Sequence, residues 1–174
     1  MLFEPLGIDG VYGILSKPNV DPRGELRRVW DKHSVLADFK LCQASVVFNP
    51  TLGTLRGLHF QLEPFSEKKV VECLSGRAFD VIVDLRLDSP SYGNHVELLL
   101  GPGQNFLGAV VPAGCAHGYL TLEPETSLIY FMDKEYSPEN ASGLLWNDPK
   151  LSIKWPMNPT LLSAQDSTWP GFQE

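Results

Sequence analysis

Short apolar runs recur along the chain at intervals of roughly ten residues, and turn-forming residues separate them. The runs are rich in valine, isoleucine, leucine and aromatic residues, whereas Gly, Pro, Asn and Asp occupy the spacers. They cover residues 11–16, 44–48, 69–74, 78–85, 96–100, 109–111, 120–122 and 127–132. This spacing, with no alternation of strands and helices, predicts an all-β antiparallel sandwich or barrel. The short spacer around Gly76 predicts that the two runs flanking it form a hairpin.

Helical periodicity is confined to two short segments. Residues 31–40 can place Val35, Leu36 and other apolar side chains on one helical face, and residues 161–164 can form one helical turn. We therefore expect a few short helices beside the strands. No linker, repeat or low-complexity tract divides the chain, so we also expect one domain over residues 1–174.

Composition narrows the classes of function. The formal net charge of −7 argues against a nucleic-acid-binding protein, which would present a basic face. Any anionic ligand must therefore be held by a few local arginines. The chain also lacks the glycine-rich phosphate loops of the Rossmann and P-loop folds.

The cysteines and the apolar runs together predict a cytoplasmic protein. Cys42, Cys73 and Cys115 are odd in number and form no CxxC pair, which is typical of buried free thiols in a reducing compartment. The first residues include Glu4 and Asp9 and do not resemble a signal peptide. No window approaches the roughly 20 apolar residues that a membrane helix needs.

Two short segments carry candidate chemistry. One runs from Gly53 to Gln61 and contains Arg56 and His59, three residues apart; the other contains His117 after a Pro-Ala-Gly turn. A guanidinium can hold an anionic substrate, and an imidazole can accept and return a proton near neutral pH. The pattern therefore favours removal of a proton from a carbon beside an anion-binding site.

The same segments resemble the metal-binding signatures of cupins, with one difference. A cupin usually supplies His-x-His in the earlier segment, whereas this chain has His59-Phe60-Gln61. Two histidines without a firm carboxylate rarely hold a transition metal tightly, and Gln is a poor ligand for zinc or iron. We expect a cupin-like jelly roll that uses acid–base chemistry and no metal. A metal-dependent oxygenase is the least favoured alternative.

A longer set of motifs extends over nearly the whole chain. It consists of Asp21-x-Arg23-Gly24, residues 55–61, Lys69, residues 79–86, 89–93 and 112–118, Trp146-Asn147-Asp148-Pro149, Trp155-Pro156 and Leu162-Ser163-Ala164-x-Asp166. In this order the motifs resemble the dTDP-4-dehydrorhamnose 3,5-epimerase family. The resemblance implies a jelly roll without a cofactor, usually a homodimer. It also implies epimerisation of a nucleoside-diphosphate 4-keto-6-deoxy sugar beside its ketone.

The resemblance also implies roles for four catalytic residues. His59 would be the base, and Asp166 would orient its imidazole. Lys69, directed inward while Lys68 faces outward, would stabilise the enolate oxygen. Tyr130 would deliver a proton from the opposite side of the sugar. The structural alternatives are a core histidine, an N-cap aspartate, a solvated lysine pair and a core tyrosine.

Further residues match substrate-binding positions of the family. Arg56 and Arg23 would hold the diphosphate, with Arg23 contributed by the partner subunit, while Gln61 and His117 would lie close to the substrate. Surface ion pairs are the alternative for the two arginines. Two aspartates of the strand at 78–85 share a face. We interpret Asp80 as a supporting partner for the site and Asp84 as structural.

Departures from the family pattern lie in the nucleotide-binding positions. Arg28 stands where the family usually has Glu, residues 43–49 lack the usual Gln-Asp-Asn-His-Ser pattern, and Glu135 replaces an aromatic residue. The base therefore stays open between dTDP, CDP and other nucleotides, and the inverted carbon between C3, C5 and both. A ketoisomerase and a non-catalytic sugar-nucleotide-binding cupin remain alternative functions.

Overall fold

The computed structural model describes residues 1–15, 18–31 and 35–173, which contain strands, turns and irregular segments. The strands are β1 (Leu2–Pro5), β2 (Tyr12–Leu15), β3 (Asn19–Asp21), β4 (Gly24–Leu26), β5 (Gln43–Asn49), β6 (Leu55–Gln61), β7 (Lys69–Ser75), β8 (Ala78–Asp84), β9 (His95–Leu100), β10 (Gly108–Val111), β11 (Cys115–Thr121), β12 (Thr126–Met132) and β13 (Ala141–Gly143). The observed strands include every run predicted from the apolar pattern, with ends shifted by a few residues.

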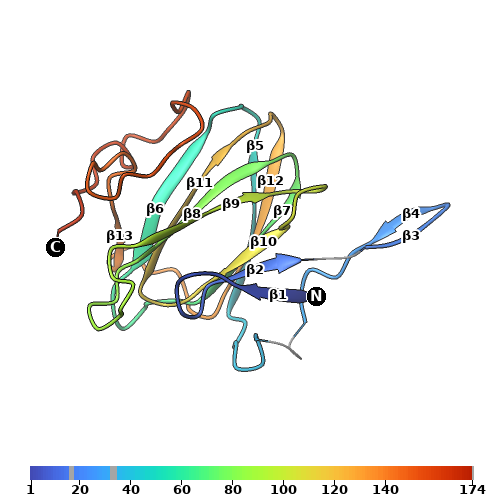
Figure 1. Cartoon of the computed structure of the whole chain (residues 1–174), viewed down its shortest axis with the longest axis horizontal. Coiled ribbons are helices and arrows are strands. Elements are labelled where there is room, and N and C mark those ends of the chain that lie inside the picture. Colours follow the sequence, from blue (N-terminus) through green and yellow to red (C-terminus); the bar gives the residue numbers. More distant parts are fainter. Residues whose placement is uncertain (16–17, 32–34, 174) are drawn as a thin grey trace.

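Two antiparallel sheets face each other and form a β-sandwich (Figure 1). The larger sheet has the order β1-β2-β10-β7-β12-β5, and the smaller has the order β13-β6-β11-β8-β9. The remaining pair, β3 and β4, forms a hairpin that projects from the sandwich. The all-β, jelly-roll-like architecture predicted from the sequence is confirmed.

The main core lies between the two sheets. Alternating side chains of β7 and β8 point into it, among them Val71, Cys73 and Ile82, which are fully buried. Burial of one such side chain contributes roughly 1.5–3 kcal/mol, so this layer supplies much of the stability of the sandwich.

Irregular segments cover the outer faces of both sheets. Trp30, Leu36 and Phe39 pack on the larger sheet. Trp155 and Phe172, from the segment that follows β13, pack on the smaller sheet. The segment that covers the smaller sheet also brings the C-terminal residues beside β6 (Figure 1), which matters for the site.

The predicted hairpin around Gly76 is wrong. β7 pairs with β10 and β12 in the larger sheet, whereas β8 pairs with β9 and β11 in the smaller sheet. The short connection therefore turns the chain from one sheet to the other. Gly76 allows this because its φ is +72° and a Cβ there would lie 2.9 Å from the Cα of Thr126. Spacing alone cannot separate such a corner from a hairpin.

The predicted short helices are also wrong for the described residues, none of which is helical. In the first segment residues 35–38 form a turn, and residues 32–34 lie outside the described part. In the second, residue 161 forms an isolated bridge with Thr54, residues 162 and 163 have no regular structure, and turns begin at residue 164. Isolated segments this short gain little from helical hydrogen bonds, so the packing of their apolar side chains on the sandwich decides their conformation. No helix in the described part of the chain is long and apolar enough to cross a membrane.

Glu72 of β7 carries its carboxylate in the buried interior. Its side chain is fully buried, and neither carboxylate oxygen has a hydrogen-bond partner among the described residues. Burial raises the pKa of Glu72 to about 7, and the attraction of Arg27 offsets only part of this rise. Between the ordinary pKa of 4.5 and this value, the unfolded chain loses a proton that the folded chain keeps. Stability is therefore lost as the pH rises through this window.

We expect a Glu72→Gln variant to be more stable than the wild type above neutral pH, by up to about 3 kcal/mol. Near pH 4.5, where the folded wild type keeps the proton on Glu72, the two proteins should be nearly equal. Denaturant unfolding near pH 4.5 and near pH 8 measures the difference, with the exposed Glu139→Gln as the control. A difference that is the same at both pH values would contradict the prediction.

Candidate active site

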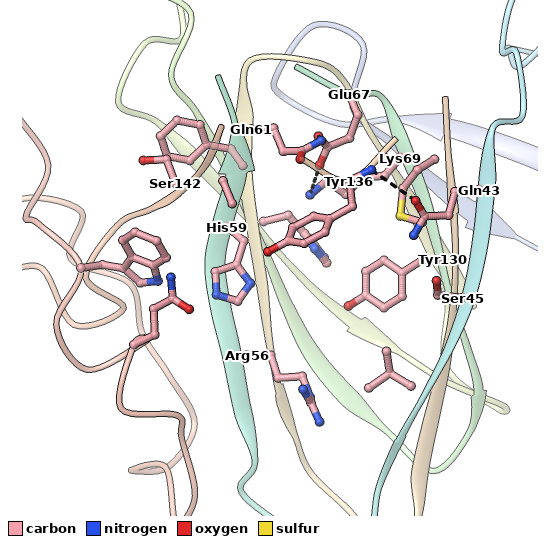
Figure 2. Close-up of a pocket in the computed structure, with 17 residues that line it drawn as sticks. Gln43, Ser45, Arg56, His59, Gln61, Glu67, Lys69, Tyr130, Tyr136 and Ser142 are labelled. Atoms are coloured by element: carbon pink, nitrogen blue, oxygen red, sulfur yellow. Dashed lines mark hydrogen bonds and ion pairs between the residues drawn. The ribbon is translucent and has the colours of Figure 1, made fainter. Parts of the chain in front are cut away.

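A pocket of about 370 Å³ lies between the two sheets, where β5 and β12 of the larger sheet face β6 and β13 of the smaller. It is lined by Gln43, Ser45, Val47, Arg56, His59, Phe60, Gln61, Glu67, Lys69, His117, Tyr130, Met132, Tyr136, Ala141, Ser142, Gln165 and Trp169. Figure 2 shows that His59 and Tyr130 enter from opposite sides, with Arg56 at one end and Lys69 at the other. Its size suits a small ligand whose position a few polar groups determine.

His59 of β6 is paired with Asp166 from the C-terminal segment. The His59 Nε2 and Asp166 Oδ1 atoms are 2.6 Å apart, although 107 residues separate them in sequence. The imidazole is 44% exposed, whereas the carboxylate is only 6% exposed. Because Asp166 engages Nε2, the Nδ1 atom is left to exchange a proton with a ligand.

The charge on Asp166 is stabilised by hydrogen bonds. Burial alone would raise its pKa, but bonds from His59, Trp169 and Ser163 hold the pKa of Asp166 below its ordinary value. The carboxylate therefore stays ionised near neutral pH. It can orient the imidazole and stabilise the imidazolium that forms on proton uptake.

The second imidazole also has a carboxylate partner. His117 of β11 lies opposite His59 in the β6–β11 register, and its Nε2 is 2.6 Å from Oδ2 of Asp80. Both members of this pair are almost completely buried. Asp80 and Asp84 face the interior of the sandwich. Asp84 instead accepts hydrogen bonds from Arg86 and from nearby serines in the loop after β8.

Tyr130 of β12 lies across the pocket from His59. Its ring contacts His117 edge-on, with the ring centroids 6.0 Å apart. Burial raises the pKa of the Tyr130 phenol well above its ordinary value, and Tyr119 and Asp80 raise it further. The phenol therefore stays protonated at neutral pH and can act as a proton donor.

Lys69 projects into the pocket, whereas Lys68 turns away and donates to the backbone of Val35. The Lys69 ammonium is 10% exposed and lies 2.8 Å from the carboxylate of Glu67. The ion pair with Glu67 fixes the position of the Lys69 ammonium at one end of the pocket (Figure 2). Such a charge can stabilise a developing oxyanion because water is largely excluded.

Gln61 has its amide fully engaged by the protein. Its Nε2 contacts Glu67 and the carbonyls of Phe65 and Glu135, and its Oε1 accepts from the Ser137 backbone N–H. The Gln61 amide therefore helps to fix the position of the Glu67 carboxylate that pairs with Lys69. It lies at the pocket edge, but the protein already satisfies its hydrogen-bonding groups.

The two predicted arginines lie in different places. Arg56 lines the pocket, and its Nε donates to Oδ1 of Asn49 at 2.9 Å. Asn49 is itself held by Tyr119 and by the Thr126 carbonyl. Arg23 lies on the projecting β3–β4 hairpin, where it is 89% exposed and paired with Asp21. Within one chain, the described structure does not bring Arg23 to the pocket.

Sequence reasoning missed several pocket residues. Glu67 and Tyr136 lie in connections between strands, and Trp169 lies in the tail just beyond the last recognised motif. Glu67 lies close in sequence to Lys69, and Trp169 lies close to Asp166, and this proximity is the signal in the sequence. Tyr136 follows Glu135, one of the departures from the family pattern. Among the described residues, no group of three or more His, Cys, Asp and Glu side chains is placed to hold a metal ion.

Comparison with known proteins identifies the family. The profile of the dTDP-4-dehydrorhamnose 3,5-epimerase family matches residues 5–174. A dTDP-4-dehydrorhamnose 3,5-epimerase of Sinorhizobium fredii is 41% identical over 179 residues, covering 100% of this chain and 91% of that protein.

Two solved structures agree with this match. The epimerase of Bacillus anthracis with TDP and PPi bound has a TM-score of 0.92 and 32% identity, covering 98% of this chain and 99% of that one. The enzyme of Legionella pneumophila in complex with dTDP-4-keto-L-rhamnose has a TM-score of 0.88 and 29% identity, covering 99% of both chains. This chain belongs to the dTDP-4-dehydrorhamnose 3,5-epimerase family.

Proposed function

We propose that this protein inverts C3 and C5 of a dTDP-4-keto-6-deoxyhexose by proton transfer, without a cofactor. The observation that carries the proposal is the His59–Asp166 pair, which faces Tyr130 across a pocket whose end holds Lys69. Epimerisation beside a ketone requires a base on one side, an acid on the other and a charge for the enolate oxygen. These three requirements match the residues of the pocket.

In the proposed reaction, Nδ1 of His59 accepts the proton from the carbon beside the ketone. The C–H electron pair forms the enolate double bond, and the carbonyl electrons move to oxygen, where Lys69 stabilises the charge. Tyr130 then donates its phenolic proton to the opposite face of the same carbon, and the ketone forms again. Solvent returns a proton to Tyr130 and removes one from His59, so the stereocentre is inverted with no net redox change.

Arg56 and Arg23 would hold the diphosphate of the substrate. For Arg23 this requires a homodimer, in which the β3–β4 hairpin of one subunit reaches the pocket of its partner. Val20 and Leu26 on that hairpin are 74% and 72% exposed, which favours a covered position in an assembly. Light scattering that gave the mass of a single chain would contradict the dimer. The free thiols favour a cytoplasmic location.

We propose dTDP as the nucleotide of the substrate because the two related structures hold TDP and a dTDP-linked sugar. The test is NMR in deuterated water with dTDP-, CDP-, UDP- and GDP-linked 4-keto-6-deoxy sugars. We expect deuterium uptake at C3 and C5 of the dTDP sugar together with inverted products. Uptake at one carbon would reassign the protein as a mono-epimerase, and migration of the carbonyl would make it a ketoisomerase. Binding without exchange would show a non-catalytic protein.

A further inference from the structure

Trp169 touches both members of the proton-transfer pair. Its indole N–H donates to Oδ1 of Asp166 with an Nε1–Oδ1 distance of 3.2 Å, and this is the oxygen that pairs with His59. The indole also meets the imidazole edge-on, with ring centroids 6.3 Å apart and an interplanar angle of 70°. One side chain therefore contacts the carboxylate and the base together.

Gly143 makes room for this arrangement. It is the partner of His59 in the β6–β13 register, so the indole lies against the strand beside the imidazole. A Cβ at position 143 would lie 2.6 Å from both Cε2 and Nε1 of Trp169, closer than any side chain permits. The position of the indole therefore depends on a glycine at the site.

The shared oxygen has a chemical consequence. Two N–H donors on Oδ1 restrict rotation of the Asp166 carboxylate, so the direction in which it holds the imidazole is defined. The indole N–H also draws charge from that oxygen, because it competes with His59 for the same lone pairs. The imidazolium formed during the reaction is then stabilised less than it would be by a carboxylate bound to His59 alone.

We propose that Trp169 is a positioning residue, which sets the orientation and the proton affinity of His59 through Asp166. The proposal rests on the proposed function for its catalytic consequence, but its effect on His59 can be measured without substrate. Trp169 is not required to contact the reacting carbon. It acts on the base through one hydrogen bond and one ring contact.

The test is a Trp169→Phe variant, which keeps an aromatic ring and removes the N–H. In substrate-free protein followed by NMR, we expect the titration midpoint of the His59 ring protons to move to higher pH. The other titratable groups that line the pocket are the same in both proteins; they are Arg56, Glu67, Lys69, His117, Tyr130 and Tyr136. With the sugar nucleotide, we expect kcat to fall roughly ten- to a hundredfold while KM changes little, because the base is misaligned.

Trp155→Phe is the matched control. It also removes an indole hydrogen bond, from Nε1 of Trp155 to the Trp146 carbonyl at 2.8 Å, but outside the pocket. If Trp169→Phe does not fold, Trp169→Met also removes the N–H and is expected to move the His59 titration in the same direction. A His59 titration equal to that of the wild type, or a rise in KM alone, would overturn the proposal. If the wild type fails to exchange deuterium while the titration still shifts, the proposed function fails and the positioning of His59 stands.

Discussion

A His59→Asn variant should lose solvent deuterium incorporation into the substrate by about a thousandfold or more, while remaining folded. Asparagine has nearly the size of the imidazole's inner half, so its amide does not reach the position of Nε2 that pairs with Asp166. The amide also cannot accept a proton at neutral pH. The side chain is partly exposed, so its replacement should cost little stability. The measurement is the rate of deuterium uptake at C3 and C5 by NMR, with thermal unfolding as a check on folding.

His95→Asn provides the matched control for this variant. His95 lies on β9, where its Nε2 is 3.3 Å from Glu97, and it is not part of the pocket lining. Its replacement should leave deuterium uptake unchanged. Undiminished uptake in a folded His59→Asn protein would show that another group is the base, and the proposed mechanism would have to be abandoned.

A Tyr130→Phe variant should lose inversion more strongly than deuterium exchange. The substitution removes only the hydroxyl, so His59 can still abstract a proton and return one to the same face. We expect the rate of epimerisation to fall by roughly a hundred- to a thousandfold, while exchange with retained configuration persists. A change in the ratio of exchange to inversion is specific to the loss of an opposing acid. General damage to the pocket would lower both rates together.

Product NMR in deuterated water measures both rates in one experiment. Tyr92→Phe serves as the control, because it removes a hydroxyl that donates to the Gln173 carbonyl at 2.8 Å outside the pocket. Epimerisation at the wild-type rate in Tyr130→Phe would exclude the phenol as the acid. The buried position of His117 beside the same pocket would then make it the next candidate.

The positions of the strands were predictable because strand formation depends on the pattern of neighbouring residues. Val70 and Val71, or Ile82 and Val83, point to opposite faces of a sheet, and both faces of these strands are covered. Apolar runs bounded by turn residues therefore reveal where strands lie. The same local information cannot say which sheet a strand joins. The turn at Gly76 resembles a hairpin in sequence, but it crosses between the sheets.

The residues of the candidate site also differ in whether the local sequence reveals them. Arg56, His59 and His117 were found from two short segments, since the chemical type of each side chain is present in the sequence itself. Asp166 was found only through its match to a family motif. Its pairing with His59 depends on the C-terminal segment packing beside β6.

The Arg56–His59 segment by itself indicated the kind of chemistry: a candidate base beside a candidate anion-binding group, with Gln61 where a metal-binding cupin has His. Only the tertiary structure decided what surrounds that base. In the folded chain Trp169 donates to the Asp166 oxygen that pairs with His59, and Glu67 forms an ion pair with Lys69. Arg23 lies on the projecting hairpin, away from the pocket. The physical reason is that the reactivity of a side chain is intrinsic to the residue. Its orientation and proton affinity depend on neighbours that folding brings from distant parts of the chain.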